Sequence, residues 1–143
     1  MKVIYSAAPF NISHLKSVIK YVDLTVVNQS EHALLVKEFG PNFDKPLLIT
    51  KGSKGSCYLS TSKKLKCATP DVTPVDTTGA GDTYLGYFAS YLDQGMSIGE
   101  AMDIASFAAA LQVTKNGTSE AIPSLKTVTK FWKNSGIKTL ILN

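Results

Sequence analysis

A glycine-rich run near the middle of the chain has the residue types that phosphoryl transfer requires. Thr77–Asp82 reads TTGAGD, and apolar residues at helical spacing follow it. A turn that leads into a helix points backbone N–H groups outward, and Gly79 and Gly81 let those groups approach an anion closely. Charge on a transferring phosphoryl group would be stabilised there, and Asp82 could accept a proton from an attacking hydroxyl. By itself, the run also fits an ordinary loop in which Asp82 caps a helix.

A second glycine pair follows an apolar run. Gly52 and Gly55 come directly after Leu47–Thr50, which suits a loop over nucleotide phosphates, although a plain turn into a hairpin would look the same. The loop is not a Walker A motif, because the chain has no G-x-x-x-x-G-K-[ST] pattern.

Asn28 and Glu31 follow another apolar run and are one helical turn apart. Their oxygen atoms could hold a hydrated Mg²⁺, although a helix cap with a surface Glu is the simpler interpretation. All three segments come where a strand is expected to end, and ligands of open α/β sheets collect beyond the carboxyl ends of the strands. The joint case for a nucleotide site is therefore stronger than any one segment.

Alternating patterns predict an α/β fold with a mainly parallel sheet flanked by helices. We expect strands at Lys2–Ser6, Leu24–Val27, Leu47–Thr50 and Ile137–Leu142, and a hairpin over Ser56–Ala68. We expect helices from Asn11 or Ser13 to about Val22, over Ser30–Glu38, Ala80–Gln94 and Ser97–Thr114, and around Val128–Trp132.

The composition indicates one folded domain and disfavours several classes of function. The 143 residues are 44% hydrophobic and 18% charged, as in folded proteins. The basic residues are all Lys, whereas a nucleic-acid reader is expected to use Arg. No apolar run approaches the ~18–20 residues that span a bilayer, so neither a membrane nor a nucleic-acid partner is expected. With no targeting segment visible, we expect a cytoplasmic location.

Two residue types that often form crosslinks or metal sites give no such signal here. Cys57 and Cys67 could face each other in the expected hairpin, but cytoplasmic thiols normally stay reduced, so two buried thiols are expected rather than a disulfide. His14 and His32 lack partners at zinc-ligand spacing, so no zinc site is predicted.

Together, the motifs resemble those of the ribokinase (pfkB) family of carbohydrate kinases. Asp76–Thr83 is similar to the family's second signature, Asn28–Glu31 to its Asn-x-x-Glu motif, and Thr50–Gly55 to its Thr-x-Gly-x-x-Gly nucleotide loop. The order and spacing are also similar, and the resemblance runs from about Lys2 to Trp132. It implies the C-terminal half of a three-layer ribokinase-like fold.

The resemblance implies a role for each matched position. Asp82 would be the general base that deprotonates the sugar hydroxyl attacking ATP, and Gly79, Ala80 and Gly81 would form the anion hole. The nucleotide would be bound by Thr50, Lys51, Gly52, Ser53, Lys54, Gly55, Thr77 and Ser106, the last of these near the adenine. Asn28 and Glu31 would organise Mg²⁺. A K⁺ ion beside the anion hole would be held, largely through main-chain carbonyls, by Asp76, Thr78, Gln112, Lys115, Gly117 and Ala121.

The chain differs from the family's kinases in length, because they are about twice as long. Residues 1–143 are expected to form a single nucleotide-binding and catalytic portion, without the N-terminal half that supplies much of the sugar pocket and the lid. Such a chain could be cut from a longer kinase, be a truncated or split gene product, or be a free-standing module. A half-sheet would expose an edge and apolar surface, so the other half or a second copy is an expected partner.

Two classes of function remain open from the sequence. The chain could transfer a phosphoryl group from ATP to a sugar hydroxyl, or it could be a non-catalytic module that binds a nucleotide or a partner protein. Asp82 favours the enzyme, because a pure binder needs no base at that position, whereas the missing sugar pocket favours the binding module for this chain alone. The motifs do not distinguish ribose from fructose or nucleoside substrates.

Overall fold

The computed structural model describes residues 3–41 and 43–142, so Lys2 of the expected first strand lies outside the described residues. The chain divides into two compact units. The first comprises Met1–Lys51, Cys57–Leu65 and Ile141–Asn143, and the second comprises Gly52–Ser56 and Lys66–Leu140. Each unit is described by itself.

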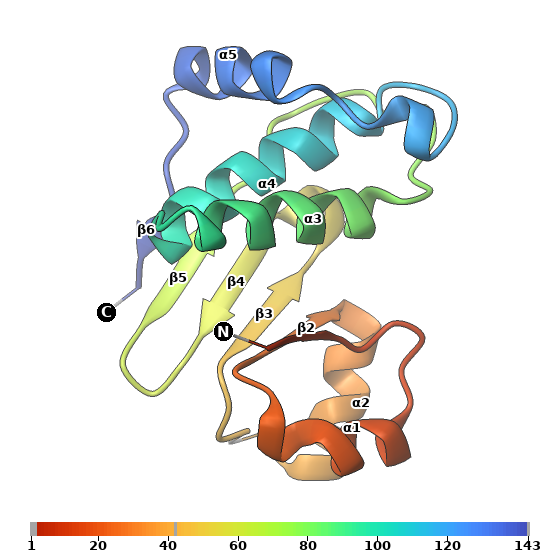
Figure 1. Ribbon diagram of the computed structural model, residues 1–143, viewed down its shortest axis with the longest axis vertical. Coiled ribbons are helices and arrows are strands. Elements are labelled where there is room, and N and C mark those ends of the chain that lie inside the picture. The colour runs from red at the N-terminus through yellow and green to blue at the C-terminus, as the bar shows by residue number, and fades with distance from the viewer. Residues whose placement is uncertain (1–2, 42, 143) are drawn as a thin grey trace. The chain divides into compact units, whose positions relative to one another are not determined.

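Three parallel strands open the sheet of the first unit. β1 (Ile4–Ser6) pairs with β2 (Leu24–Asn28), and β2 pairs with β3 (Leu47–Thr50), as Figure 1 shows. Asn28 lies opposite Thr50 in the register. The polar residues that end these two strands are therefore neighbours at the carboxyl edge of the sheet.

Helices α1 (Ile12–Val18) and α2 (Gln29–Phe39) complete the first unit. Leu15 of α1 and Leu35 of α2 have no exposed surface. They belong to one apolar cluster with alternate residues of the strands, because successive side chains of a strand point to opposite faces. The buried strand residues of this cluster are Val27, Leu47 and Ile49.

The sheet has six strands in the order β1-β2-β3-β4-β5-β6. The strands β4 (Ser56–Leu59) and β5 (Lys64–Cys67) form the expected hairpin, whose turn is closed by a bond of 2.8 Å from Ser60 N to Lys63 O. The last strand is β6 (Leu140–Ile141), shorter than expected. Because a hairpin is antiparallel and β1–β3 are parallel, the sheet is mixed, and the predicted α/β class is confirmed.

Three helices dominate the second unit. Figure 1 shows α3 (Ala80–Asp93) beside α4 (Ile98–Gln112), with α5 (Leu125–Ser135) packed against α4. The predicted capping box starts α4: Ser97 Oγ accepts from Glu100 N at 3.3 Å, and Glu100 Oε2 accepts from Ser97 N at 3.0 Å. The helix begins where the sequence indicates because these bonds satisfy amides that the helix leaves unpaired.

Helix α4 is buried along most of its length, as its apolar sequence predicts. Ala101, Ala105 and Ala108 are fully buried, and such small side chains let neighbouring elements approach closely. Among the described residues, Phe88 of α3 and Phe107 of α4 are the largest side chains with no exposed surface. The core of the second unit is therefore centred on α3 and α4.

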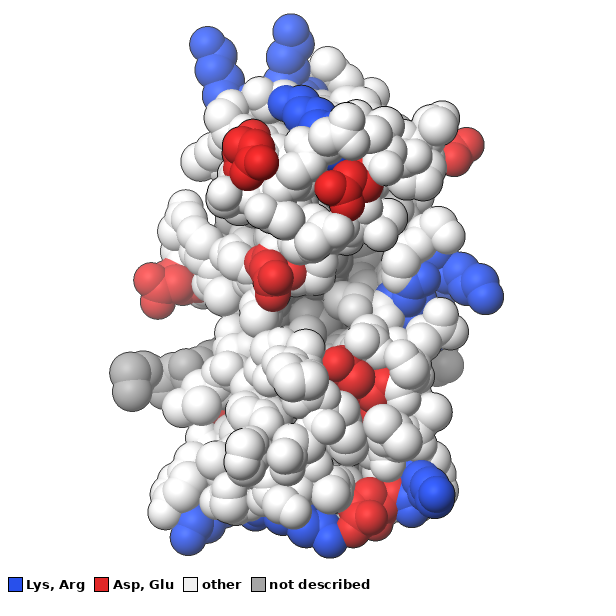
Figure 2. Space-filling model, turned by 90° about the vertical axis from the view of Figure 1, so that its right-hand side faces the viewer, with Lys and Arg blue, Asp and Glu red and all other residues white. Residues whose placement is uncertain are grey.

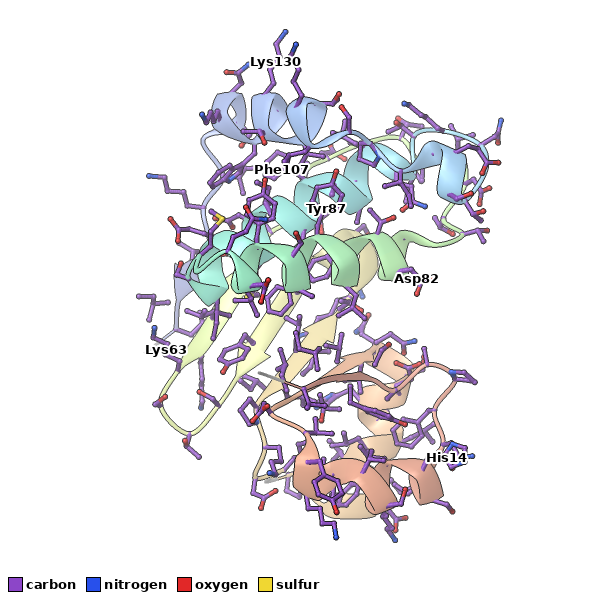
Figure 3. The ribbon with its side chains drawn as sticks, viewed as in Figure 1. His14, Lys63, Asp82, Tyr87, Phe107 and Lys130 are labelled. Atoms are coloured by element: carbon purple, nitrogen blue, oxygen red, sulfur yellow. The ribbon has the colours of Figure 1, made fainter. Side chains whose placement is uncertain are left out.

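Helix α5 has one buried face and one lysine face. Val128 is fully buried, whereas Lys126, Lys130 and Lys133 are exposed. Figure 2 shows lysine side chains gathered at this end of the second unit, and Figure 3 shows Lys130 pointing away from it. The lysines fit a solvated helix face. No helix in the described part of the chain is long and apolar enough to cross a bilayer.

Both cysteines are free thiols, as expected, but their environments differ. Cys67 has no exposed surface, and its Sγ donates to Asp103 Oδ1 at 3.4 Å. Burial, above all, raises the pKa of the Cys67 thiol to about 12. Cys57 is half-buried, and its Sγ accepts a hydrogen bond of 3.3 Å from Lys51 Nζ.

The two thiols should therefore react differently in the native protein. Only a thiolate attacks alkylating reagents, so Cys67 should stay unmodified by iodoacetamide at about pH 8, while Cys57 is alkylated. Mass spectrometry of the intact chain should show one adduct in the native protein and two after unfolding in urea. Rapid addition of two adducts without denaturant would contradict the burial of Cys67.

Candidate functional site

The predicted anion-hole turn is the start of α3. Gly79 is the N-cap residue, Ala80 N donates to Thr77 O at 3.3 Å, and Thr83 N donates to Gly79 O at 2.9 Å. Gly81 and Asp82 lie between these two residues. Within residues 3–41 and 43–142, their backbone amides have no acceptor outside the helix. Because the first amides of a helix lack intrahelical partners, this turn can donate to an anion.

The two glycines of the turn serve different purposes. Gly79 has a φ of +77°, and a Cβ there would lie 3.1 Å from Gln112 Nε2, so its backbone needs glycine. A Cβ on Gly81 would meet nothing within 4 Å, so this glycine leaves the surface in front of the amides open. Asp82 is exposed in the first turn, and Figure 3 shows its side chain projecting from the end of α3. Its carboxylate is accessible from solvent.

Asp76 connects the residues just before this turn to a loop near Gly117. Its Oδ1 accepts from Thr78 N at 2.9 Å, and its Oδ2 accepts from Gly117 N at 3.2 Å. The bonds from Thr78 and then from Gly117 hold the pKa of Asp76 below its usual value. Asp76 is therefore a carboxylate at neutral pH.

Gln112, at the end of α4, makes a second tie. It is 1% exposed, and its Nε2 donates to Thr78 O at 3.2 Å and to Thr118 O at 3.4 Å. Its Oε1 has no partner in the described part of the chain. One buried amide thus bridges the residue before Gly79 and a loop forty residues further on.

These bonds bear on the predicted K⁺ site. They bring Asp76, Thr78, Gln112 and Gly117 together, and a carboxylate with main-chain carbonyls is a suitable oxygen set for a hard cation. However, the Thr78 carbonyl already accepts from Gln112, and the Gln112 carbonyl accepts from Lys115 N at 3.0 Å. A cation would therefore compete with the Gln112 side chain for the Thr78 carbonyl.

Ala121, the last of the predicted K⁺ residues, is buried at the end of the short turn Ser119–Ala121. Its N–H donates to Thr118 O at 3.2 Å, the carbonyl that also accepts from Gln112. Thr118 is not among the predicted K⁺ residues. Its bond from Gln112 could not be predicted from motif spacing, because it depends on the turn that the chain makes after α4.

Residues Gly52–Gly55 of the predicted nucleotide loop form a tight turn in the second unit. Gly52–Lys54 forms one 3-10 turn, closed by Gly55 N donating to Gly52 O at 3.0 Å, and Thr69 Oγ1 donates to Gly52 O at 3.0 Å. Gly52, Ser53 and Lys54 are exposed, whereas Gly55 is buried. The turn therefore presents three residues to solvent and anchors the fourth.

Asn28 and Glu31 form a capping box at the start of α2. Asn28 Oδ1 accepts from Glu31 N at 3.0 Å and from Ser30 Oγ at 2.8 Å, and Glu31 Oε2 accepts from Asn28 N at 2.7 Å. The simpler interpretation of the motif is thus present in the structure. The capping box uses only one oxygen of the Glu31 carboxylate, so Oε1 is left for another ligand. The Mg²⁺ role of the two residues stays a prediction.

The first unit adds a contact that the motifs did not indicate. Thr50 Oγ1 donates to Val27 O at 3.4 Å. Burial of the His32 imidazole, and then the positive charge of Lys51, lowers the pKa of His32. His32 follows Glu31 directly in the sequence. The Lys51 ammonium and a neutral His32 therefore lie near the start of α2.

Ser106 has a local partner. It is 3% exposed within α4, and its Oγ donates to Ala68 O at 3.1 Å. The Ser106 hydroxyl therefore binds the chain just after β5. The role of Ser106 near the adenine stays a prediction. Within the described residues, no three His, Cys, Asp or Glu side chains are grouped as metal ligands.

The fold is α/β, and its glycine-rich turns stand at the start of α3 and after β3. The sequence pattern of the pfkB family of carbohydrate kinases matches residues 2–125. The chain therefore belongs to the pfkB family, as the motifs predict.

Known proteins support this assignment over part of their length. The ribokinase of Lactococcus lactis is 32% identical over 133 residues, which cover 90% of this chain and 44% of the relative. Arabidopsis thaliana ribokinase, solved with ribose and ATP, has 27% identity and a TM-score of 0.81 over 94% of this chain and 48% of its own. An E. coli protein named Ribokinase II, solved with ATP and Mg²⁺, has 25% identity and a TM-score of 0.75, over 85% and 42%. The chain spans less than half the length of these proteins.

The glycine turn allows a matched test of its geometry. A Cβ on Gly55 would lie 2.0 Å from Cys67 O at a φ of +84°, whereas a Cβ on Gly52, at a φ of +56°, would meet nothing within 4 Å. Gly55→Ala should lower the free energy of unfolding by more than about 2 kcal/mol, and Gly52→Ala by only about 1 kcal/mol. Urea unfolding of both variants measures this difference, and equal losses would contradict the anchored turn.

Proposed function

We propose that this chain supplies the phosphoryl-transfer part of an ATP-dependent carbohydrate kinase. The observation that carries the proposal is the start of α3, where the amides of Gly81 and Asp82 have no acceptor among the described residues and adjoin an exposed carboxylate. Membership of the pfkB family supports a sugar hydroxyl as the acceptor. The ribokinases among its relatives favour a ribose-like sugar.

The chemistry follows from the residues of this turn. Asp82 takes the proton of the sugar hydroxyl, whose oxygen forms a bond to the γ-phosphorus as the bond from that phosphorus to the bridging oxygen of ADP breaks. The backbone of Gly79, Ala80 and Gly81 would meet the negative charge on the transferring group, chiefly through Gly81 N, because Ala80 N already donates to Thr77 O. The positive end of α3 strengthens this effect.

The nucleotide-binding residues are proposed from the motifs and from neighbours that bind ATP. They are Thr50, Lys51, Gly52, Ser53, Lys54, Gly55, Thr77 and Ser106. Mg²⁺ bound with ATP would neutralise phosphate charge. Asn28 and Glu31 would hold its water molecules, chiefly through Glu31 Oε1, the oxygen outside the capping box.

We also propose a K⁺ site beside the turn. Its ligands would be oxygens of Asp76, Thr78, Gln112, Lys115, Gly117 and Ala121, largely main-chain carbonyls, so that the Gln112 side chain is not itself a ligand. The described bonds among Asp76, Thr78, Gln112 and Gly117 support this set, since they bring these residues together. The ion would fix the turn from which the anion hole is built.

Release of ADP tests the proposed reaction. The chain should be combined with the remaining part of a pfkB-family kinase and assayed with a panel of sugars. Asp82→Asn should reduce turnover by at least about 100-fold, because it removes the base, while ATP affinity changes by no more than a few-fold. Asp93→Asn, at the other end of α3, is the matched control and should keep full turnover. Turnover that survives Asp82→Asn would make the base assignment wrong.

The same assay distinguishes the alternative function. A non-catalytic module would bind ATP or a partner protein without releasing ADP from any sugar. This alternative stays open because the chain spans only 44% of the Lactococcus lactis ribokinase. ATP binding with no turnover in the combined protein would therefore reject the kinase proposal.

The K⁺ proposal has its own test. Gln112→Ala removes the donor that competes for the Thr78 carbonyl, so the variant should show a larger K⁺-specific rise in its unfolding midpoint than the wild type. Thermal unfolding in KCl and in choline chloride of equal ionic strength measures the rise. Gln94→Ala removes an exposed amide bonded to Ser90 and should behave as the wild type. Absence of any K⁺-specific rise in all three proteins would remove the ion from the proposal.

A further inference from the structure

A chemically reactive pair of residues lies in the loop that follows α4. Asn116 and Gly117 come between the end of α4 and the short turn Ser119–Ala121, outside any regular helix or strand (Figure 1). Asn116 is exposed, and its carboxamide has no hydrogen bond to another described residue. Because no bond fixes this side chain, Asn116 Cγ can turn toward the backbone nitrogen of Gly117.

Gly117 presents its nitrogen without a side chain beside it. Its φ is +99°, and a Cβ there would lie 2.5 Å from Glu120 Oε1, so the fold requires glycine at this position. The residue before it is asparagine, whose carboxamide carbon is open to attack by the next backbone nitrogen. An Asn-Gly pair allows this attack most readily, because glycine does not shield its own nitrogen.

The reaction open to this pair is deamidation. The Gly117 nitrogen forms a bond to Asn116 Cγ, and the side-chain nitrogen leaves as ammonia with the proton that Gly117 N gives up. A cyclic imide remains, and water opens it at either of its carbonyls to give aspartate or iso-aspartate. The reaction consumes only water, and it needs no oxidant, metal or nucleotide.

Two carboxylates oppose the first step of this reaction. Gly117 N donates to Asp76 Oδ2 at 3.2 Å, and the Glu120 carboxylate lies against the same glycine. The nitrogen attacks only once its proton is lost, and that loss would place a new negative charge beside two existing ones. Like charges at such short distances repel strongly. The native loop therefore disfavours the nucleophile that deamidation requires.

We propose that Asn116 is a site of spontaneous deamidation and that the Asp76 carboxylate holds this modification in check. Separation of Asp76 from Gly117 N releases the reaction. Iso-aspartate adds one carbon to the main chain between residue 116 and the Gly117 nitrogen, and either product adds a negative charge near Asp76 and Glu120. The modified loop therefore loses the Asp76–Gly117 bond that protected it.

The modification acts on the start of α3 through Asp76. Asp76 Oδ1 accepts from Thr78 N at 2.9 Å, so this side chain joins the loop to the residue before Gly79. Without the bond from Gly117, the Gln112 side chain is left as the tie between Thr78 and α4. Deamidation uses neither ATP nor a sugar, so its outcome is separate from that of the kinase proposal.

Ageing of the full 143-residue chain in mildly alkaline buffer tests the site. Peptide mapping by mass spectrometry measures deamidation at residue 116, which should be at least about fivefold slower in the native protein than in urea. Asp76→Asn removes the charge with little change in volume, so the native rate at residue 116 should rise at least about threefold. Asp71→Asn removes an exposed carboxylate of the same unit and should react as the wild type.

Asn134 is an internal control for unfolding in the same molecule. It is exposed and precedes the small residue Ser135, but it lies within α5. Its rate should be the same in the wild type and in Asp76→Asn. A rise at both asparagines would assign the effect to general unfolding and overturn the role of Asp76, and so would equal rates at residue 116 in the two proteins. A native rate at residue 116 as fast as that in urea would also overturn the proposal.

The effect of the product has its own measurement. Glutamine forms the corresponding imide much more slowly, so Asn116→Gln should keep its unfolding midpoint after ageing. Wild type aged until most of residue 116 is deamidated should unfold at a lower temperature than fresh wild type, because the bond from Gly117 to Asp76 is lost. An unchanged midpoint in such a sample would show that the product leaves the loop intact and would overturn the proposed loss of the bond.

Discussion

The start of α3 depends on one buried side chain. Gln112 reaches from the end of α4 to the carbonyls of Thr78 and Thr118. The Asp76 carboxylate accepts from Thr78 N in the same turn and from Gly117 N. Because the helix behind this turn is packed into the core, its amides and Asp82 are presented by a rigid element rather than a free loop. The proposed chemistry relies on this rigidity, since positioned donors stabilise developing charge at little reorganisation cost.

Local patterns predicted the elements and the places where polar residues gather. The strands before Asn28 and Thr50 end where apolar runs give way to polar residues, and their neighbouring positions follow from parallel pairing. The Ser97–Glu100 capping box marked the start of α4, because its bonds join residues three apart. Such signals are readable in sequence because every partner is a few residues away.

Contacts between distant segments could not be predicted in the same way. The bonds from Gln112 to Thr78 and from Ser106 to Ala68 join residues 34 and 38 positions apart. Burial of Gln112 needs the packed helix around it, and no spacing rule in the sequence encodes that.

The capping box of Asn28 and Glu31 has a consequence for how this chain tolerates its environment. Most proteins whose folds require a metal lose structure when a chelator removes the ion. Here the two residues proposed for the ion already satisfy the first amides of α2 with their own oxygens. The start of α2 therefore does not need a metal ion to satisfy these amides, so removal of magnesium by a chelator should leave the helix folded.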